Sequence, residues 1–180
     1  MKLRRFSPFL RKPVIWGACG MLTVALAAPL PAAEEVNTAG VFGGAKIEEV
    51  YRIALNKGDL LLESILAAIE KHGIKDGALL TAAGSLEECT FHGVSSRAGT
   101  TEQWLTTKKG GMEILNINGL IADGEAHFHM TLSNEQGAFG GHLEEGCRVL
   151  NRAELTIAKF SGPPLARKPN AAGGRALAPK

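Results

Sequence analysis

Apolar residues recur along the middle of the chain with two different spacings, and each spacing predicts one kind of secondary structure. Between Asp59 and Gly73, leucine, isoleucine and alanine recur every three or four residues, which places them on one side of a helix. We therefore predict a helix that Asp59 caps and that ends at His72 and Gly73. Elsewhere, alternating apolar and polar residues or clusters of β-branched residues predict strands.

The predicted strands number about seven, and short turn-forming segments join most of them. Breaks or turns are expected at Gly84, at residues 108–111 and at Gly119, where glycine interrupts the pattern. Strand-forming residues occupy eight segments, which we expect to make about seven strands: 48–55, 78–83, 89–94, 103–107, 112–122, 125–133, 138–142 and 149–160. One helix beside closely connected strands predicts an α+β domain built mostly on antiparallel sheet.

Residues 1–33 have the pattern of a secretory signal peptide. Five basic residues come before an apolar run at 14–28, and small residues follow at Ala32 and Ala33. The apolar run is shorter than the roughly 20 residues that a membrane-spanning helix needs. We expect cleavage and a periplasmic or secreted mature protein, with an uncleaved membrane anchor as the alternative.

The remaining chain divides into three parts by composition. Residues 34–47 are rich in alanine and glycine and are predicted to be a flexible lead-in. Residues 48–160 carry the periodic patterns of a folded domain. Residues 161–180 form a basic tail rich in proline and glycine, so we expect no regular structure there.

The formal charge of the whole chain, +2, conceals an uneven distribution. Residues 1–33 hold five basic residues, residues 161–180 hold four, and neither segment holds an acidic one. Residues 34–160 hold 11 basic and 18 acidic residues, a formal charge of −7. Such a domain lacks the positive surface that supplies most non-specific affinity for nucleic acid, so we do not expect a nucleic-acid partner.

Two cysteines, Cys89 and Cys147, remain after the predicted cleavage. An oxidising compartment would permit a disulfide, but pairing requires Cα atoms within about 7 Å, which the sequence does not establish. We expect two buried thiols that pack as small apolar groups, with a disulfide as the alternative.

Two histidines stand out in the most regular of the predicted strands, residues 126–132. Phe128 and Met130 lie on one face of this strand, and His127 and His129 lie on the other. Because the apolar side chains occupy the core face, the histidines are available for another role. Residues i and i+2 on one strand face lie about 6.5 to 7 Å apart, a distance from which two imidazoles can converge on one ion.

The turn at residues 134–137 is expected to bring a third histidine to the same place. If this turn closes a hairpin with a two- or four-residue loop, the numbers of paired residues sum to 271. His142 then lies opposite His129 and diagonal to His127, with cross-strand Cβ atoms about 4.5 to 5.5 Å apart. A three-residue loop would shift the register by one residue and separate the histidines.

Three neutral imidazoles favour Zn²⁺ among the common cations and leave one coordination position for water or a small ligand. Copper or nickel would accept the same donors, and a metal-free polar cluster is the remaining alternative. Glu113 is the candidate general base, fourth ligand or partner of a ligand, as opposed to an ordinary surface carboxylate. His92 is expected to line a pocket or the surface, and His72 to compensate the helix dipole. Gly140 and Gly141 predict a bulge or turn that also clears space beside the ion.

Several short motifs occur together in order: Arg52, Lys57-Gly58-Asp59-Leu60, Ala82-Ala83-Gly84-Ser85-Leu86, Glu113-Ile114-Leu115, Gly119, His127-Phe128-His129 and Gly140-Gly141-His142-Leu143. From about residue 48 to 160 the chain resembles the PPC domain, a family conserved in plants and prokaryotes. The resemblance implies an α+β domain that assembles as a homotrimer, with metal on the three matching histidines in prokaryotic members. The family's fold is also similar to that of acetolactate decarboxylase, a zinc enzyme that uses three histidines.

Three functions follow as hypotheses, and we favour the first. It is an exported, trimeric zinc-binding domain whose three-histidine site is open to a small anionic ligand. The second is a metal-dependent lyase or hydrolase that acts on a small keto acid, with Glu113 moving a proton. The third is DNA binding, which the resemblance suggests because plant members accompany AT-hooks. The chain has no Arg-Gly-Arg-Pro AT-hook core, and the signal segment and the charge of −7 disfavour this role.

Overall fold

Eight strands and one helix make up the part of the chain that the structure describes. This structure is a computed structural model that describes residues 40–95, 103–170 and 174–180, all within the unit Asn37–Lys180. The elements in chain order are β1 Lys46–Asn56, α1 Leu61–Lys71, β2 Gly77–Val94, β3 Gln103–Ala122, β4 Glu125–Asn134, β5 Gly137–Leu143, β6 Arg148–Ser161, β7 Leu165–Pro169 and β8 Arg175–Pro179.

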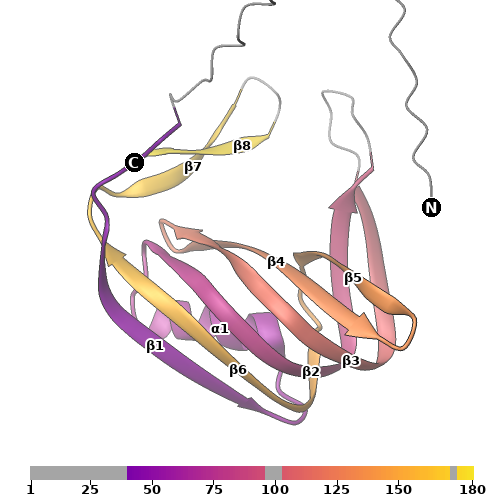
Figure 1. Cartoon of the computed structure of the whole chain (residues 1–180). Coiled ribbons are helices and arrows are strands. Elements are labelled where there is room, and N and C mark those ends of the chain that lie inside the picture. Colours follow the sequence, from indigo (N-terminus) through magenta and orange to yellow (C-terminus); the bar gives the residue numbers. More distant parts are fainter. Residues whose placement is uncertain (1–39, 96–102, 171–173) are drawn as a thin grey trace, which may run out of the picture. The chain divides into compact units, whose positions relative to one another are not determined.

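Six of the strands form one sheet in the order β1-β6-β2-β3-β4-β5, and β7 pairs with β8 separately (Figure 1). All of these described pairings are antiparallel. The predicted α+β class, with mostly antiparallel sheet and one helix, agrees with this arrangement. The number of strands is eight in two sheets, where the sequence predicted about seven.

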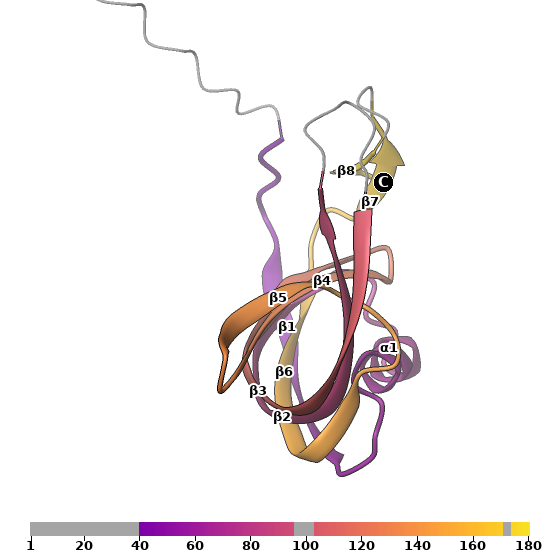
Figure 2. The ribbon, with the colours of Figure 1, turned by 90° about the vertical axis from the view of Figure 1, so that its right-hand side faces the viewer.

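The sheet curls until its last strand, β5, also pairs with β2. Near its end, β2 pairs with β5 through Phe91 opposite Leu143 and His92 opposite His142. Because β2 also pairs with β3, β3 with β4 and β4 with β5, these four strands form a closed ring. Figure 2 shows the strong curvature of these strands.

Strands β2 and β3 are continuous where the sequence predicted interruptions. The expected breaks at Gly84 and Gly119 and the expected turn at 108–111 lie inside the two strands. Their pairing shifts register between Leu86 and Glu88, which marks a β-bulge or similar irregularity. Such irregularities bend a strand without ending it, so glycine here permits curvature rather than a turn.

Helix α1 buries one side against the sheet, as its periodicity predicts. Leu61, Ile65 and Ile69 are buried in the core cluster. The capping prediction was wrong, because the Oδ2 of Asp59 accepts a hydrogen bond from the Asn56 N–H at 2.8 Å and the helix lacks a side-chain cap. The N–H of Leu61 instead donates to the Cys147 carbonyl at 2.8 Å, so the backbone leading into β6 satisfies one N–H of the first turn.

The two cysteines lie in the same core as free thiols, which was the favoured expectation. Cys89 and Cys147 are buried, and their Sγ atoms are 3.3 Å apart. The N–H of Thr90 also donates to the Cys147 Sγ at 3.2 Å. The pair packs β2 against the segment that leads into β6.

The prediction of an irregular tail was wrong, because β7 and β8 form a hairpin between residues 165 and 179. Leu165 lies opposite Pro179, and Pro169 lies opposite Arg175. Pro169 and Pro179 are each the last residue of a strand. Proline lacks an N–H, so it is tolerated at a strand end, and a proline-rich segment can still form a short two-stranded ribbon.

The first part of the chain is described only in part. The predicted signal peptide, residues 1–33, lies outside the described residues, as do residues 34–39 of the predicted lead-in. Residues 41–45 have no regular structure, whereas Lys46 and Ile47 already belong to β1. In the described ranges, no helix has the length and apolar character to cross a membrane.

Candidate metal centre

Strand β4 separates the predicted core residues from the predicted ligands. Phe128 and Met130 are buried, at 2% and 3% exposure, whereas His127 and His129 are exposed. The alternation of this strand is therefore confirmed over its whole central part. It places two imidazoles on the same outward face.

The β4–β5 hairpin has the predicted register. Asn134 pairs with Gly137, which leaves a two-residue loop, and His129 lies opposite His142. The Oδ1 of Asn134 accepts a hydrogen bond from the Gln136 N–H at 2.9 Å, which stabilises the turn. The third histidine consequently joins the other two.

Gly140 and Gly141 allow β5 to lie between β4 and β2. A Cβ at residue 140 would lie 2.0 Å from the Met130 carbonyl oxygen, and a Cβ at residue 141 would lie 2.3 Å from the His92 carbonyl oxygen. Both contacts are with backbone atoms, so a side chain at either position would push neighbouring strands apart. These glycines hold His142 close to His129 on one side and to His92 on the other.

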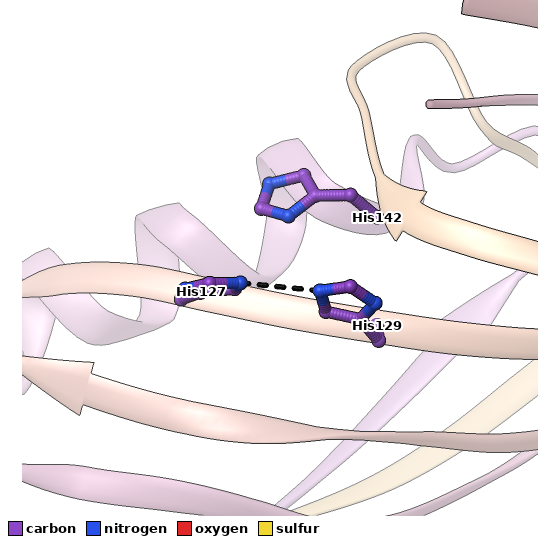
Figure 3. A group of neighbouring side chains, drawn as sticks. All are labelled: His127, His129 and His142. Carbon is purple, nitrogen blue, oxygen red and sulfur yellow. Dashed lines mark hydrogen bonds between the residues drawn. The ribbon is translucent and has the colours of Figure 1, made fainter. Parts of the chain in front are cut away.

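The three imidazole rings form a compact triangle (Figure 3). The ring centroids of His127 and His129 are 5.2 Å apart, those of His127 and His142 are 4.9 Å apart, and those of His129 and His142 are 5.3 Å apart. The Nε2 atoms of His127 and His129 share a hydrogen bond of 3.1 Å. Figure 3 shows His142 reaching from β5 towards the two histidines of β4.

This donor set fits a metal ion. One ring nitrogen from each of His127, His129 and His142 lies within 4.8 Å of the other two. Nitrogens bound to a tetrahedral Zn²⁺ at 2.0–2.1 Å are about 3.3 Å apart, so small rotations of the rings would suffice. Three neutral nitrogen donors suit zinc, copper or nickel better than magnesium or calcium, which prefer oxygen.

Electrostatics keep two of these rings neutral at neutral pH. Partial burial, helped by neighbouring His92 and His127, lowers the pKa of His142 from its ordinary 6.5 to about 4. Partial burial also lowers the pKa of His127, with a further contribution from the positive charge of Arg167. At a given pH their nitrogen lone pairs are therefore more available to a metal than those of an ordinary histidine.

The low pKa of His142 predicts a loss of stability in acid for the metal-free protein. Between pH 6.5 and about 4 the unfolded chain binds a proton at this residue while the folded chain does not, so stability falls as the pH falls. The free energy of unfolding of the wild type should therefore fall between pH 7 and pH 4.5. Allowing for the partial exposure of His142, we expect this fall to be about 2 kcal/mol smaller in His142→Ala. Urea unfolding of chelator-treated protein at pH 7 and pH 4.5 measures it. An equal fall in both proteins would contradict the assignment.

A second group of possible ligands lies directly beside the triangle. His92, which the sequence placed on a pocket wall or surface, stacks on His142 with centroids 4.5 Å apart. Its Nδ1 makes a short hydrogen bond to Oε1 of Glu144. His92, His142 and Glu144 also offer ligand atoms within 4.8 Å of one another.

Sequence reasoning missed Glu144. Its signal was present, because Glu144 follows His142 by two residues, the spacing that returns a side chain to the same face of a strand. It was hidden because β5 ends at Leu143, one residue before Glu144. The contact of Glu144 with His92 also depends on the pairing of β2 with β5, and the local sequence pattern does not reveal that pairing.

Glu113, the predicted acid, is not brought to the histidines within one chain. It lies opposite Ser133, four residues along β4 from His129, which corresponds to about 13 Å. Together with Ser85 and Arg152 it lines a cavity of about 410 Å³. Glu144, by contrast, offers a carboxylate oxygen within 4.8 Å of ring nitrogens of His92 and His142.

His72 has the structural position that the sequence suggested. It follows the last residue of α1, and its ring centroid is 4.5 Å from that of Tyr51 on β1. Neither of the two groups of possible ligands in the described residues contains it. It therefore serves as a histidine control in the experiments below.

The described residues thus define a small antiparallel α+β domain that displays clustered imidazoles on an outward sheet face. Residues 43–161 match the Plants and Prokaryotes Conserved (PCC) domain. The chain belongs to this family, and the predicted resemblance is confirmed at that level. The β7–β8 hairpin lies beyond the matched residues.

A curated relative matches this chain over only part of its own length. The chain is 29% identical over 126 residues to the bifunctional protein GlmU of Synechococcus sp. (strain JA-3-3Ab). The match covers 69% of this chain but only 19% of that protein. The chain therefore spans about a fifth of the length of this relative.

Solved structures share the fold. A plant- and prokaryote-conserved (PPC) protein of Pyrococcus horikoshii has a TM-score of 0.64 and 26% identity, and the match covers 75% of this chain and 94% of that one. A metal-containing protein of Archaeoglobus fulgidus has a TM-score of 0.63 and 19% identity over 73% and 94%. A candidate DNA-binding protein of Bacteroides thetaiotaomicron has a TM-score of 0.64 and 22% identity over 74% and 94%.

Proposed function

We propose that this chain is an exported zinc-binding domain whose three-histidine site is open to a small ligand. The observation that carries the proposal is the triangle of His127, His129 and His142, with one nitrogen of each ring within 4.8 Å of the other two. The lowered pKa of His127 and of His142 supports it, because metal ligands must be unprotonated. The metal-containing relative of Archaeoglobus fulgidus is consistent with it.

The residues of this chain would hold the ion and leave room for a ligand. Three protein ligands leave the fourth tetrahedral position open, as in catalytic rather than structural zinc sites. Zinc in such a site polarises a carbonyl or makes bound water more acidic. The imidazoles are oriented by the β4–β5 register and by the close strand packing at Gly140 and Gly141.

A lyase or hydrolase that acts on a small keto acid is the second candidate function. The hydrogen bond between His92 Nδ1 and Glu144 Oε1 favours it, because this pair could hold or accept a proton beside the open position. Glu113 remains a candidate for the same role only if a second copy of the chain brings it to the site. Turnover of an acetolactate-like acid that is lost in Glu144→Gln would select this function.

Export and trimer formation belong to the proposal as well. Export rests on the basic and apolar pattern of residues 1–33, and the trimer rests on the family resemblance. Recovery of the mature chain in the periplasmic or secreted fraction, at three times the monomer mass by light scattering, is the expected result. A full-length cytoplasmic monomer would contradict both. We do not propose DNA binding, because residues 34–160 have a formal charge of −7.

Elemental analysis of purified protein tests metal binding directly. We expect about one zinc per chain in the wild type and none in the variant with His127, His129 and His142 all changed to alanine. His72→Ala should keep the wild-type content, because its ring packs on Tyr51 instead. Equal metal content in the wild type and the triple variant, both shown to be folded by circular dichroism, would refute the proposal.

A further inference from the structure

The β7–β8 hairpin docks on the end of the β3–β4 hairpin through basic side chains. Arg167 donates from Nη1 to the Glu125 carbonyl at 2.7 Å and from Nη2 to the Leu120 carbonyl at 3.0 Å. Arg175 forms an ion pair of 2.6 Å with the Glu125 carboxylate and donates to the Arg167 carbonyl at 2.8 Å. Lys180 forms an ion pair with Asp123, with 2.5 Å between its Nζ and the Oδ1 of the carboxylate.

These contacts place the guanidinium of Arg167 on the backbone carbonyls of Leu120 and Glu125, two residues that neighbour His127 in the sheet. Leu120 lies opposite His127 in the β3–β4 pairing, so the two side chains share a face. Glu125 precedes His127 by two residues on β4 and shares that face too. The largest charge effect on the pKa of His127 comes from Arg167, which agrees with this proximity.

Apolar side chains of the hairpin and of the main sheet line a shared cavity. Leu165 of β7 and Leu177 of β8 face Leu120 and Phe160 of the main sheet across a cavity of about 260 Å³. Arg167 itself is half-buried, and two carbonyls orient its planar group. Its position is therefore set by the fold and does not depend on a freely moving side chain.

An arginine at this place works against the bound cation. A positive charge near His127, one of the three proposed ligands, repels a divalent ion, so metal affinity alone does not account for Arg167. The same charge favours an anion as the ligand at the open coordination position. Both the metal ion and the guanidinium would attract such an anion. The two hydrogen bonds from Arg167 to backbone carbonyls use only two of the five N–H groups of its guanidinium. A guanidinium binds carboxylates well through its remaining N–H groups.

We infer that Arg167 selects the ligand of the metal centre and that this ligand is a small anion bearing a carboxylate. The inference rests on the proposed function and deepens it by naming the ligand class. Arg167 lies beyond residues 43–161, so this recognition would come from the segment that follows the family domain. Arg167 acts here as a specificity residue, and His127, His129 and His142 hold the ion.

A titration of Co²⁺-loaded protein tests this inference without an activity assay. Cobalt is bound by the same donors as zinc, and its visible absorption reports changes at the open position. We expect acetate to shift the spectrum and neutral acetamide, of nearly the same shape, to leave it unchanged. In Arg167→Gln the dissociation constant for acetate should rise by about tenfold or more, because a charge-assisted hydrogen bond is lost.

Two matched variants separate ligand recognition from docking of the hairpin. Arg175→Gln removes one positive charge from the same hairpin, as Arg167→Gln does. The bonds that it loses are those to the Glu125 carboxylate and the Arg167 carbonyl. Because the Arg167 side chain is unchanged, acetate affinity should stay near the wild-type value. Arg167→Lys should retain part of the affinity. An unchanged constant in Arg167→Gln, or an equal rise in Arg175→Gln, would overturn the inference while leaving metal binding intact. Absence of cobalt bands in the wild type would overturn the proposed function and this inference together.

Discussion

Replacing His129 with alanine is expected to lower zinc affinity by more than about 100-fold, because even the loss of a residue that only orients a metal ligand costs 10- to 100-fold. His129 is central to the triangle, since it lies opposite His142 across the hairpin and two residues from His127. Its removal leaves two imidazoles, fewer than the three protein ligands of typical zinc sites. Competition with a chromophoric chelator measures the dissociation constant.

The matched variant His92→Ala decides which group of residues holds the ion. If His127, His129 and His142 hold the ion, His92→Ala should lower zinc affinity by no more than about 10- to 100-fold, which is the usual effect of losing a residue that contacts a metal ligand. If His92, His142 and Glu144 hold it, His92→Ala should lose more affinity than His129→Ala does. His72→Ala should change neither value, and a loss of similar size there would point to a general effect on the fold.

Gly119→Ala is expected to destabilise the protein by about 3 kcal/mol or more, through backbone strain and a backbone clash. Gly119 has a φ of +146°, which side chains rarely adopt, and an added Cβ would lie 2.0 Å from the His127 carbonyl oxygen. That oxygen belongs to β4 and cannot move without disturbing the strand. Since the strand carries two of the proposed ligands, zinc affinity should fall as well.

Urea unfolding of the metal-free protein measures the effect of Gly119→Ala on the free energy of unfolding. Gly111→Ala is the control within the same strand, because a Cβ there would make only an ordinary contact of 3.7 Å with Leu150. We expect this control to stay within about 0.5 kcal/mol of the wild type, as for surface substitutions. Similar unfolding midpoints for the two variants would show that β3 tolerates a side chain at residue 119.

The correct sequence predictions rest on local periodicity. The buried side of α1 follows from its three- and four-residue spacing, and the two faces of β4 follow from strict alternation. The histidine triangle required one further step, the register of a tight turn, and the pairing of Asn134 with Gly137 confirms it. Each of these features lies within about 20 consecutive residues.

The wrong predictions about strands concern glycine and proline. Gly84 and Gly119 were expected to interrupt strands, yet β2 and β3 continue through them because neighbouring strands supply the pairing on both sides. The prolines of residues 161–180 were expected to exclude strands, yet two of them lie at strand ends. Glycine and proline show where the backbone departs from regular strand geometry, but tertiary contacts decide whether the strand bends or ends there.

The sequence by itself determined the helix, the faces of β4 and the meeting of His127, His129 and His142, because all of these depend on short-range geometry. The tertiary structure alone decided what surrounds them. It brought His92 and Glu144 beside His142 through the pairing of β2 with β5, and through the docked hairpin it placed Arg167 on the carbonyl of Leu120, the residue opposite His127. It also left Glu113 about 13 Å along the sheet from His129. These placements depend on how a curled sheet closes, and residues distant in sequence then become neighbours.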